Sequence, residues 1–300
     1  MRLLFLLVPL LVACTPEADG AREGLVRVTA TTGMVADLAK RVGGDRVEVD
    51  ALMGPGVDPH LFSASPSDLE RLRAADLILY SGRGLEGKMS DIFTSLARKK
   101  PVFAVTEAIP DDRLLSPPEL HGHFDPHVWF DVALWAETLP VVAQALSEAD
   151  PAHAAEYRAR AEAYREDLLK LHEEVRTAIA TVPKERRVLI TSHDAFRYFG
   201  RAYDLEVRGL QGVSTVQDAG VRDVQDLANL IADRKIKAIF VETSVSEASI
   251  RAVQKWAQEK GHDVRIGGHL YSDAMGDTPP EDAYPGMVRK NVKTIVEALR

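Results

Sequence analysis

Residues 151–180 contain no glycine, carry proline only at position 151, and are rich in alanine, glutamate, leucine and arginine. These residue types favour helix, and the apolar ones recur at a spacing that predicts one long amphipathic helix. A coiled coil is the alternative, but the segment offers only about four heptads with weak apolar repetition. We therefore expect a single rigid helix that connects two lobes.

Short apolar runs alternate with amphipathic segments on both sides of this helix. The expected strands cover residues 26–30, 47–53, 77–82, 101–106, 188–191, 205–210, 237–242 and 263–268. A helix is also expected over 131–149, with a kink at Pro140. Such alternation predicts mostly parallel sheets with helices on both faces. The expected fold class is therefore α/β, with two lobes, each a parallel sheet flanked by helices, bridged by the long helix.

The N-terminus is typical of a targeting sequence. Arg2 precedes an apolar run, residues 3–13, which is shorter than the roughly 20 residues that a helix needs to cross a bilayer. The run ends in Leu-Val-Ala-Cys, which resembles the bacterial lipobox, and Cys14 is the only cysteine of the chain. We expect Cys14 to be lipidated, so that the protein is exported and anchored at the membrane. The alternative is a plain secretory signal with an incidental cysteine.

These observations together predict a division of the chain. We expect a signal peptide over 1–13, a lipidated tether over 14–24, an N-terminal lobe over 25–150, a linker helix over 151–182 and a C-terminal lobe over 183–300.

The charge balance argues against one class of partner. Acidic residues outnumber basic ones by 45 to 37, which gives a net charge of −8 at pH 7 with neutral histidine. Nucleic-acid binding normally needs a basic face, because the phosphates must be neutralised. We therefore expect no nucleic-acid partner.

Two of the nine histidines share one local motif. His60 and His127 each end an Asp-Pro-His tripeptide that is followed by apolar residues. Proline fixes its own φ and favours an extended residue before it, so each histidine lies in a stiff loop. One such motif is usually only a turn, but two in one chain indicate a cation site.

Two further candidates lie beyond strands of the C-terminal lobe. His193 directly follows the strand expected at 188–191, and Asp273 lies in a loop after the last expected strand. Ligands collect at the carboxyl ends of parallel strands, although each of these two residues alone could be a helix-cap neighbour or a turn residue. The successive separations, from His60 to His127, from His127 to His193 and from His193 to Asp273, are 67, 66 and 80 residues. They match neither a zinc finger nor HExxH, so these side chains can meet only in the cleft between the lobes.

Eight long sequence segments of the chain resemble those of one known protein family. They are TTGMVADLA, LMGPGVDPHLF, ADLILYSG, FDPHVWFDV, ERRVLITSHDAFRYFGRAY, LQGVST, RKIKAIFVE and IGGHLYSDAMGD, in this order over residues 26–300. The chain resembles the TroA-like family, the zinc- or manganese-binding lipoproteins that supply bacterial ABC transporters. The resemblance implies that His60, His127, His193 and Asp273 bind one divalent ion. It also implies that the partners are an ABC permease and its ATPase.

The chain departs from parts of that family in two places. Some manganese-specific relatives have glutamate where this chain has His193. Zinc-specific relatives often carry a long histidine-rich loop, whereas this chain has only His121-Gly122-His123 there. We expect Zn²⁺ as the more favourable ion, with Mn²⁺ as the alternative.

Several other residues have two alternative roles, one functional and one structural. Glu242 ends an expected strand and is a candidate to hydrogen-bond a ligating imidazole, as metal-bound histidines require, or has another strand-end role. Asp58, Asp125 and Asp194 neighbour the candidate ligands and either orient them or cap the backbone. His121 and His123 are expected in an exposed loop, with pre-capture of a metal as the alternative, and His269 is expected at the surface or in contact with a ligand. His153, His172 and His262 are expected to be solvated.

Three classes of function are consistent with such a site. A catalytic zinc usually keeps one position open for water, whereas four protein ligands close a tetrahedron, and the chain has neither HExxH nor GxSxG. An adhesin is the third possibility, but no adhesive repeat occurs. We therefore expect a non-catalytic, monomeric binding protein that delivers zinc, with manganese as a second candidate ion, to a permease. The alternative is a manganese-dedicated binding protein, and we rank a zinc hydrolase or an adhesin below both.

Overall fold

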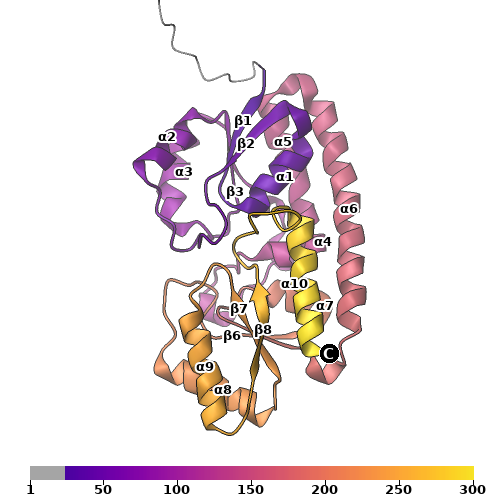
Figure 1. Ribbon diagram of the computed structural model, residues 1–300. Helices are drawn as coiled ribbons and strands as arrows, with labels where there is room; N and C mark the ends of the chain where they lie inside the picture. Colours follow the sequence, from indigo (N-terminus) through magenta and orange to yellow (C-terminus); the bar gives the residue numbers. More distant parts are fainter. Residues whose placement is uncertain (1–23) are drawn as a thin grey trace, which may run out of the picture.

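The computed structural model describes residues 24–300, so the expected signal peptide and Cys14 lie outside the described residues. Two α/β halves lie one above the other, and the helix α6 (Ala154–Ala180) runs along both of them (Figure 1). No helix within this described range combines the length and the apolar character needed to span a bilayer.

The N-terminal half contains one four-stranded parallel sheet in the order β2-β1-β3-β4. Its strands are β1 (Val26–Ala30), β2 (Val47–Ala51), β3 (Leu77–Tyr80) and β4 (Val102–Ala104). In the central pairing, Val28 lies opposite both Val49 and Leu77. The helices α1 (Gly33–Gly43) and α5 (Leu139–Ala149) pack on one face, and α2 (Pro66–Ala74) and α3 (Ser90–Leu96) pack on the other. Helices on both faces explain why most residues of the central strands β1 and β3 are buried.

The C-terminal half is built from two parallel strand pairs. The strands β5 (Val188–Thr191) and β6 (Glu206–Gly209) form one pair, and β7 (Ala238–Glu242) and β8 (Arg265–Leu270) form the other, with β5 lying beside β7. The helices α8 (Val221–Asp233) and α9 (Glu247–Glu259) cover one face. The helices α7 (Arg197–Tyr203) and α10 (Tyr284–Leu299) lie on the side of α6. The prediction of an α/β fold with parallel sheets flanked by helices is confirmed.

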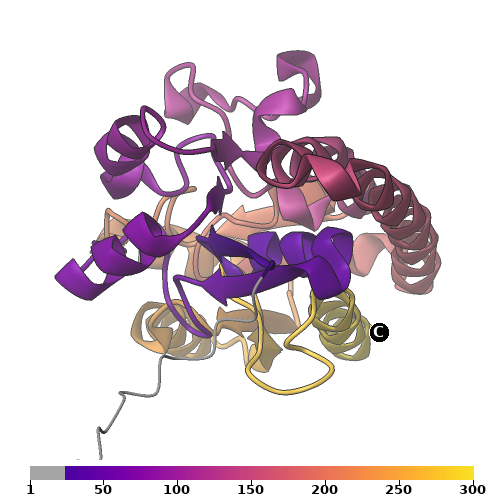
Figure 2. The same cartoon turned by 90° about the horizontal axis from the view of Figure 1, so that it is seen from above.

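The helix α6 contributes one buried stripe to both halves. Its buried residues are spaced three or four apart, and they are Tyr157, Ala161, Tyr164, Leu168, Leu171, Val175 and Ile179. This stripe contacts α1 and α5 in the N-terminal half and α7 and α10 in the C-terminal half. Viewed from above, α6 follows one side of the molecule (Figure 2). The predicted long helix is therefore present, and it packs on the two halves rather than in a coiled coil.

The continuous helix that we expected over 131–149 is divided in the structure. A short helix α4 (Val132–Trp135) is followed by a 3₁₀ turn (Ala136–Thr138) and then by α5. Pro140 is the second residue of α5, directly after the 3₁₀ turn. Proline is tolerated in a first helical turn, where its missing N–H would have no partner. The expected single helix is therefore divided, and the interruption lies immediately before Pro140.

A buried carboxylate connects three helices along the junction of the halves. Asp37 on α1 accepts hydrogen bonds from the Tyr164 hydroxyl of α6 at 2.5 Å and from the backbone N–H of Tyr284 on α10 at 3.3 Å. The Tyr284 hydroxyl donates in turn to the carbonyl of Trp129 at 2.6 Å. Polar groups buried at this depth are stabilising only when they are paired, so the three helices must keep this arrangement.

Candidate metal centre

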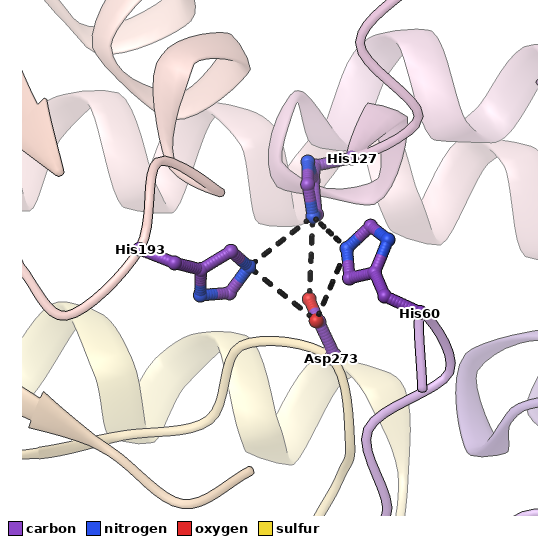
Figure 3. A group of neighbouring side chains, drawn as sticks. All are labelled: His60, His127, His193 and Asp273. Carbon is purple, nitrogen blue, oxygen red and sulfur yellow. Dashed lines mark hydrogen bonds and ion pairs between the residues drawn. The ribbon is translucent and has the colours of Figure 1, made fainter. Parts of the chain in front are cut away.

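Four loops meet where the two halves face each other. His60 lies in the loop after β2, His193 follows β5, and Asp273 follows β8. His127 directly precedes the 3₁₀ turn Val128–Phe130. The carboxyl ends of parallel strands form the usual ligand crevice of such sheets, and here strand ends from both halves of the molecule share one centre. Figure 3 shows all four side chains pointing toward this centre.

The four side chains are buried and lie close together. His127 and His193 are fully buried, Asp273 is 1% exposed and His60 is 6% exposed. Nε2 of His127 lies 3.3 Å from Nε2 of His60 and 3.4 Å from Nε2 of His193. The Asp273 oxygens lie 3.4–3.6 Å from the three Nε2 atoms. One ligand atom from each residue lies within 4.8 Å of all the others.

These separations can be compared with those around a tetrahedral ion. Zinc binds imidazole nitrogen at about 2.0–2.1 Å, which places tetrahedral ligand atoms about 3.3–3.4 Å from one another. The separations of 3.3–3.6 Å that His127 and Asp273 make with their neighbours fall at or slightly above this value, and all four ligand atoms lie within 4.8 Å of one another. The four side chains therefore enclose a space of the right size for one transition-metal ion.

The Asp273 carboxylate has both oxygens available to a cation. Oδ1 faces His127, and Oδ2 faces His60 and His193. Apart from these imidazoles, neither oxygen has a hydrogen-bond partner among the described residues. A buried, unpaired carboxylate is costly, and a cation bound through one or both oxygens would remove that cost.

A carboxylate contacts the far side of two of the imidazoles. Asp125 Oδ1 accepts from the backbone N–H of His127 at 3.0 Å and lies 2.8 Å from its Nδ1. Glu242 Oε1 accepts from the backbone N–H of His193 at 2.8 Å, and its Oε2 lies 2.5 Å from Nδ1 of the same ring. A proton on Nδ1 of each ring leaves Nε2 free to donate its electron pair to an ion.

His60 is held differently. Asp58 Oδ1 accepts from its backbone N–H at 2.8 Å, but no carboxylate contacts its Nδ1 in the described part of the chain. Asp194, the third neighbouring aspartate, pairs with Arg197 and does not contact the ring of His193. Of the three aspartates that we considered, only Asp125 contacts a ligand ring.

The charges of the cluster favour opposite protonation states in its histidines. Burial lowers the pKa of His60 to about 3, so its ring is neutral. Burial also opposes protonation of His127, but Asp125 and Asp273 outweigh it and raise the pKa to about 9. Glu242 and Asp273 likewise outweigh burial at His193 and raise its pKa well above the ordinary value. Burial disfavours ionised Asp273, yet His193 and His127 hold the pKa of Asp273 well below its usual range.

The other histidines lie outside this cluster. His121 and His123 are exposed, and His269 is exposed and pairs with Glu247 at 2.8 Å. Three histidines that were expected to be solvated are instead partly buried, so that expectation was wrong for them. His153 contacts Asp150, His172 contacts the Tyr203 hydroxyl, and His262 contacts the carbonyl of Ile236.

Sequence reasoning missed two residues that organise the centre. The indole N–H of Trp129 donates at 3.1 Å to the carbonyl of Ser272, the residue that directly precedes Asp273. The Trp129 ring also lies against the ring of His127. The Thr215 hydroxyl donates to Asp58 at 2.6 Å across the junction. Both lie within the strings that carry the family resemblance, but nothing in their local sequence indicates a contact in the other half.

Comparisons with known proteins extend over nearly the whole chain. The family model described as "Zinc-uptake complex component A periplasmic" matches residues 28–298. The manganese-binding lipoprotein MntA of Bacillus subtilis is 49% identical over 288 residues, which cover 95% of this chain and 94% of MntA. The zinc-binding protein TroA of Treponema pallidum is 48% identical over 282 residues, which cover 94% and 91%. A solved structure of that periplasmic zinc-binding protein superposes with a TM-score of 0.89, covering 92% of this chain and 99% of the other.

Proposed function

Because the chain belongs to the zinc-uptake complex component A family, we propose that it captures one divalent transition-metal ion with His60, His127, His193 and Asp273. It is the non-catalytic substrate-binding component of a metal ABC transporter, like its relatives. The observation that carries the assignment of these residues is the buried group of four ligand atoms, none more than 4.8 Å from another. The ion is cargo, because four protein ligands leave no position for a reacting water.

The donor set favours zinc over manganese. Three imidazoles and one carboxylate make a borderline site, and manganese is the weakest binder in the usual affinity order of divalent ions. If both oxygens of Asp273 bound the ion, it would have five protein ligand atoms, and this suits manganese better than a tetrahedral site does. The relatives are named for each metal, manganese for MntA and zinc for TroA, so the preference rests on chemistry alone.

A competition titration tests this assignment. Metal-free protein is titrated with zinc and with manganese against a chelator of known affinity, and elemental analysis counts the ions per chain. We expect one ion per chain and the lower Kd for zinc. A lower Kd for manganese would overturn the preference for zinc, and an unchanged Kd in Asp273→Ala would overturn the ligand assignment.

To deliver the ion to a permease, the protein must lie at the outer face of the membrane. Its relatives are named lipoproteins of metal ABC transporters, and we propose that a diacylated Cys14 anchors a monomer beside its permease and ATPase. Two acyl chains hold a protein at a bilayer far better than one. Cys14→Ser should therefore leave zinc affinity unchanged but move the protein from the membrane pellet to the soluble fraction. Recovery of the variant in the pellet would contradict the anchor.

A further inference from the structure

The three candidate imidazoles are not held equally. A carboxylate contacts the far nitrogen of His127 and of His193, whereas the ring of His60 has no such support. His60 also lies in a segment, residues 52–65, that contains no helix or strand. Long loops without regular structure are less constrained than the elements they join. His60 is therefore the ligand whose position depends most on contacts from elsewhere.

Asp58 supplies the main contact of this kind. Its Oδ1 accepts from the backbone N–H of His60 at 2.8 Å, and its Oδ2 accepts from the Thr215 hydroxyl at 2.6 Å. Thr215 is 6% exposed and belongs to the opposite half. One carboxylate thus connects the backbone of His60 to a side chain across the junction. We call the hydrogen bond between Asp58 and Thr215 the latch.

The segment that carries Thr215 is anchored beside another ligand. The backbone N–H groups of Leu210 and Gln211 donate to the carbonyls of Thr191 and Ser192 at 3.0 and 2.9 Å. The N–H of Asp194 donates to the carbonyl of Gly212 at 3.2 Å. These bonds tie residues 210–212 to the strand end that carries His193. The latch therefore joins the two ligand-bearing loops that come from different halves.

In the described part of the chain, the other hydrogen bonds of the His60 loop lie within its own half. The N–H of Val57 donates to the carbonyl of Gly54 at 3.2 Å, and the ammonium of Lys88 donates to the carbonyl of Leu61 at 3.1 Å from an exposed position. Neither bond reaches the half that carries His193 and Asp273. Opening the latch would therefore remove the hydrogen bond that connects the His60 loop to the half carrying His193 and Asp273.

We propose that Thr215 is a positioning residue for the captured ion: through Asp58 it holds His60 against the ion and sets the rate at which the ion leaves. This inference rests on the proposed function. It concerns a residue that binds no metal and lies on the half of the molecule opposite to His60.

The test compares Thr215→Val with Thr215→Ser. Valine keeps the shape of threonine without the hydroxyl, whereas serine keeps the hydroxyl, so serine is the matched control. Zinc-loaded full-length proteins are mixed with excess chelator in a stopped-flow instrument, and the rate of zinc release is recorded. A hydrogen bond to a charged group has a strength that corresponds to about tenfold or more in rate. We expect Thr215→Val to release zinc about tenfold faster and Thr215→Ser to release it at the wild-type rate.

A double substitution tests whether the effect runs through Asp58. Asp58→Ala removes the acceptor, so adding Thr215→Val to it should produce no further acceleration. Equal release rates for wild type and Thr215→Val would overturn the proposal. So would equal acceleration by valine and serine, or additive effects in the double variant. Failure of the wild-type protein to bind zinc or manganese would instead count against the proposed function.

Discussion

Single contacts decide the chemistry of the centre. The residues that contact the far sides of the imidazoles differ: Asp125 for His127, Glu242 for His193, and none for His60. At His127 and His193 these contacts fix the orientation of the imidazole ring and favour its protonation in the metal-free protein. The cluster is consequently a site in which an ion competes with protons.

The first prediction at this scale concerns pH. The pKa of His127 is raised to about 9, and that of His193 is also raised, so both rings are protonated at pH 7 in the metal-free chain. An ion must displace these protons, and the His127 proton by itself should raise the apparent Kd about tenfold for each unit that the pH falls below 9. Calorimetric titration with zinc at pH 7, in buffers of different ionisation enthalpy, should count at least one proton released per ion. A count of zero would contradict the protonation states.

The second prediction concerns the choice of metal. His193→Glu replaces an imidazole by a hard oxygen donor, but the new carboxylate would face Glu242, whose Oε2 lies 2.5 Å from the ring of His193. Combining it with Glu242→Gln removes this repulsion. We expect the double variant to lose at least about tenfold of the preference for zinc over manganese in competition titrations. Glu242→Gln alone is the control, and an equal loss in this control would show that residue 193 does not set the preference.

At the scale of elements, three helices meet at one buried carboxylate. Asp37 of α1 accepts from Tyr164 of α6 and from the backbone of Tyr284 in α10. The helices also share one apolar core, which includes residues of both halves. This arrangement makes α6 a structural support of the junction in addition to a connection along the chain.

The prediction at this scale removes one hydroxyl. Tyr164→Phe leaves Asp37 Oδ2 without its partner in the core, and we expect a loss of about 1–3 kcal/mol in the free energy of unfolding. Tyr157→Phe is a matched control on the same helix, because the Tyr157 hydroxyl bonds Asp150, which His153 also contacts near the surface. Urea denaturation of the metal-free proteins measures both. A loss no larger in Tyr164→Phe than in Tyr157→Phe would contradict the importance of the Asp37 contact.

At the scale of the whole molecule, the centre joins the two halves. His60 and His127 come from one side of α6 in sequence, and His193 and Asp273 come from the other. An ion bound by all four would link loops that otherwise contact each other through a few hydrogen bonds. The continuous helix α6 and the shared core oppose a wide rotation of the halves. The division into an N-terminal lobe over 25–150, a linker helix over 151–182 and a C-terminal lobe over 183–300 stays a prediction.

Metal binding should therefore stabilise the chain without changing its overall size. Zinc at a thousandfold excess over Kd contributes about 4 kcal/mol, which corresponds to a rise in Tm of about 10 °C. Thermal unfolding should show this rise in the wild type and a smaller one in Asp273→Ala. Small-angle scattering should give nearly equal radii of gyration with and without metal. A large difference between the radii would contradict the modest movement that we expect.

The sequence alone predicted the α/β class and the long helix from local periodicity, whereas the full set of four proposed ligands followed from the family resemblance. Helical periodicity predicts α6, and the Asp-Pro-His motifs single out His60 and His127. The sequence could not show that Asp125 contacts its neighbouring ring while Asp58 and Asp194 do not. Nor could it show the bond of Thr215 to Asp58, which are 157 residues apart. Pairing across such a distance depends on how the two halves pack around α6, and no local pattern encodes that geometry. Tertiary structure therefore decided which polar groups meet, and with it the proton and ligand chemistry of the centre.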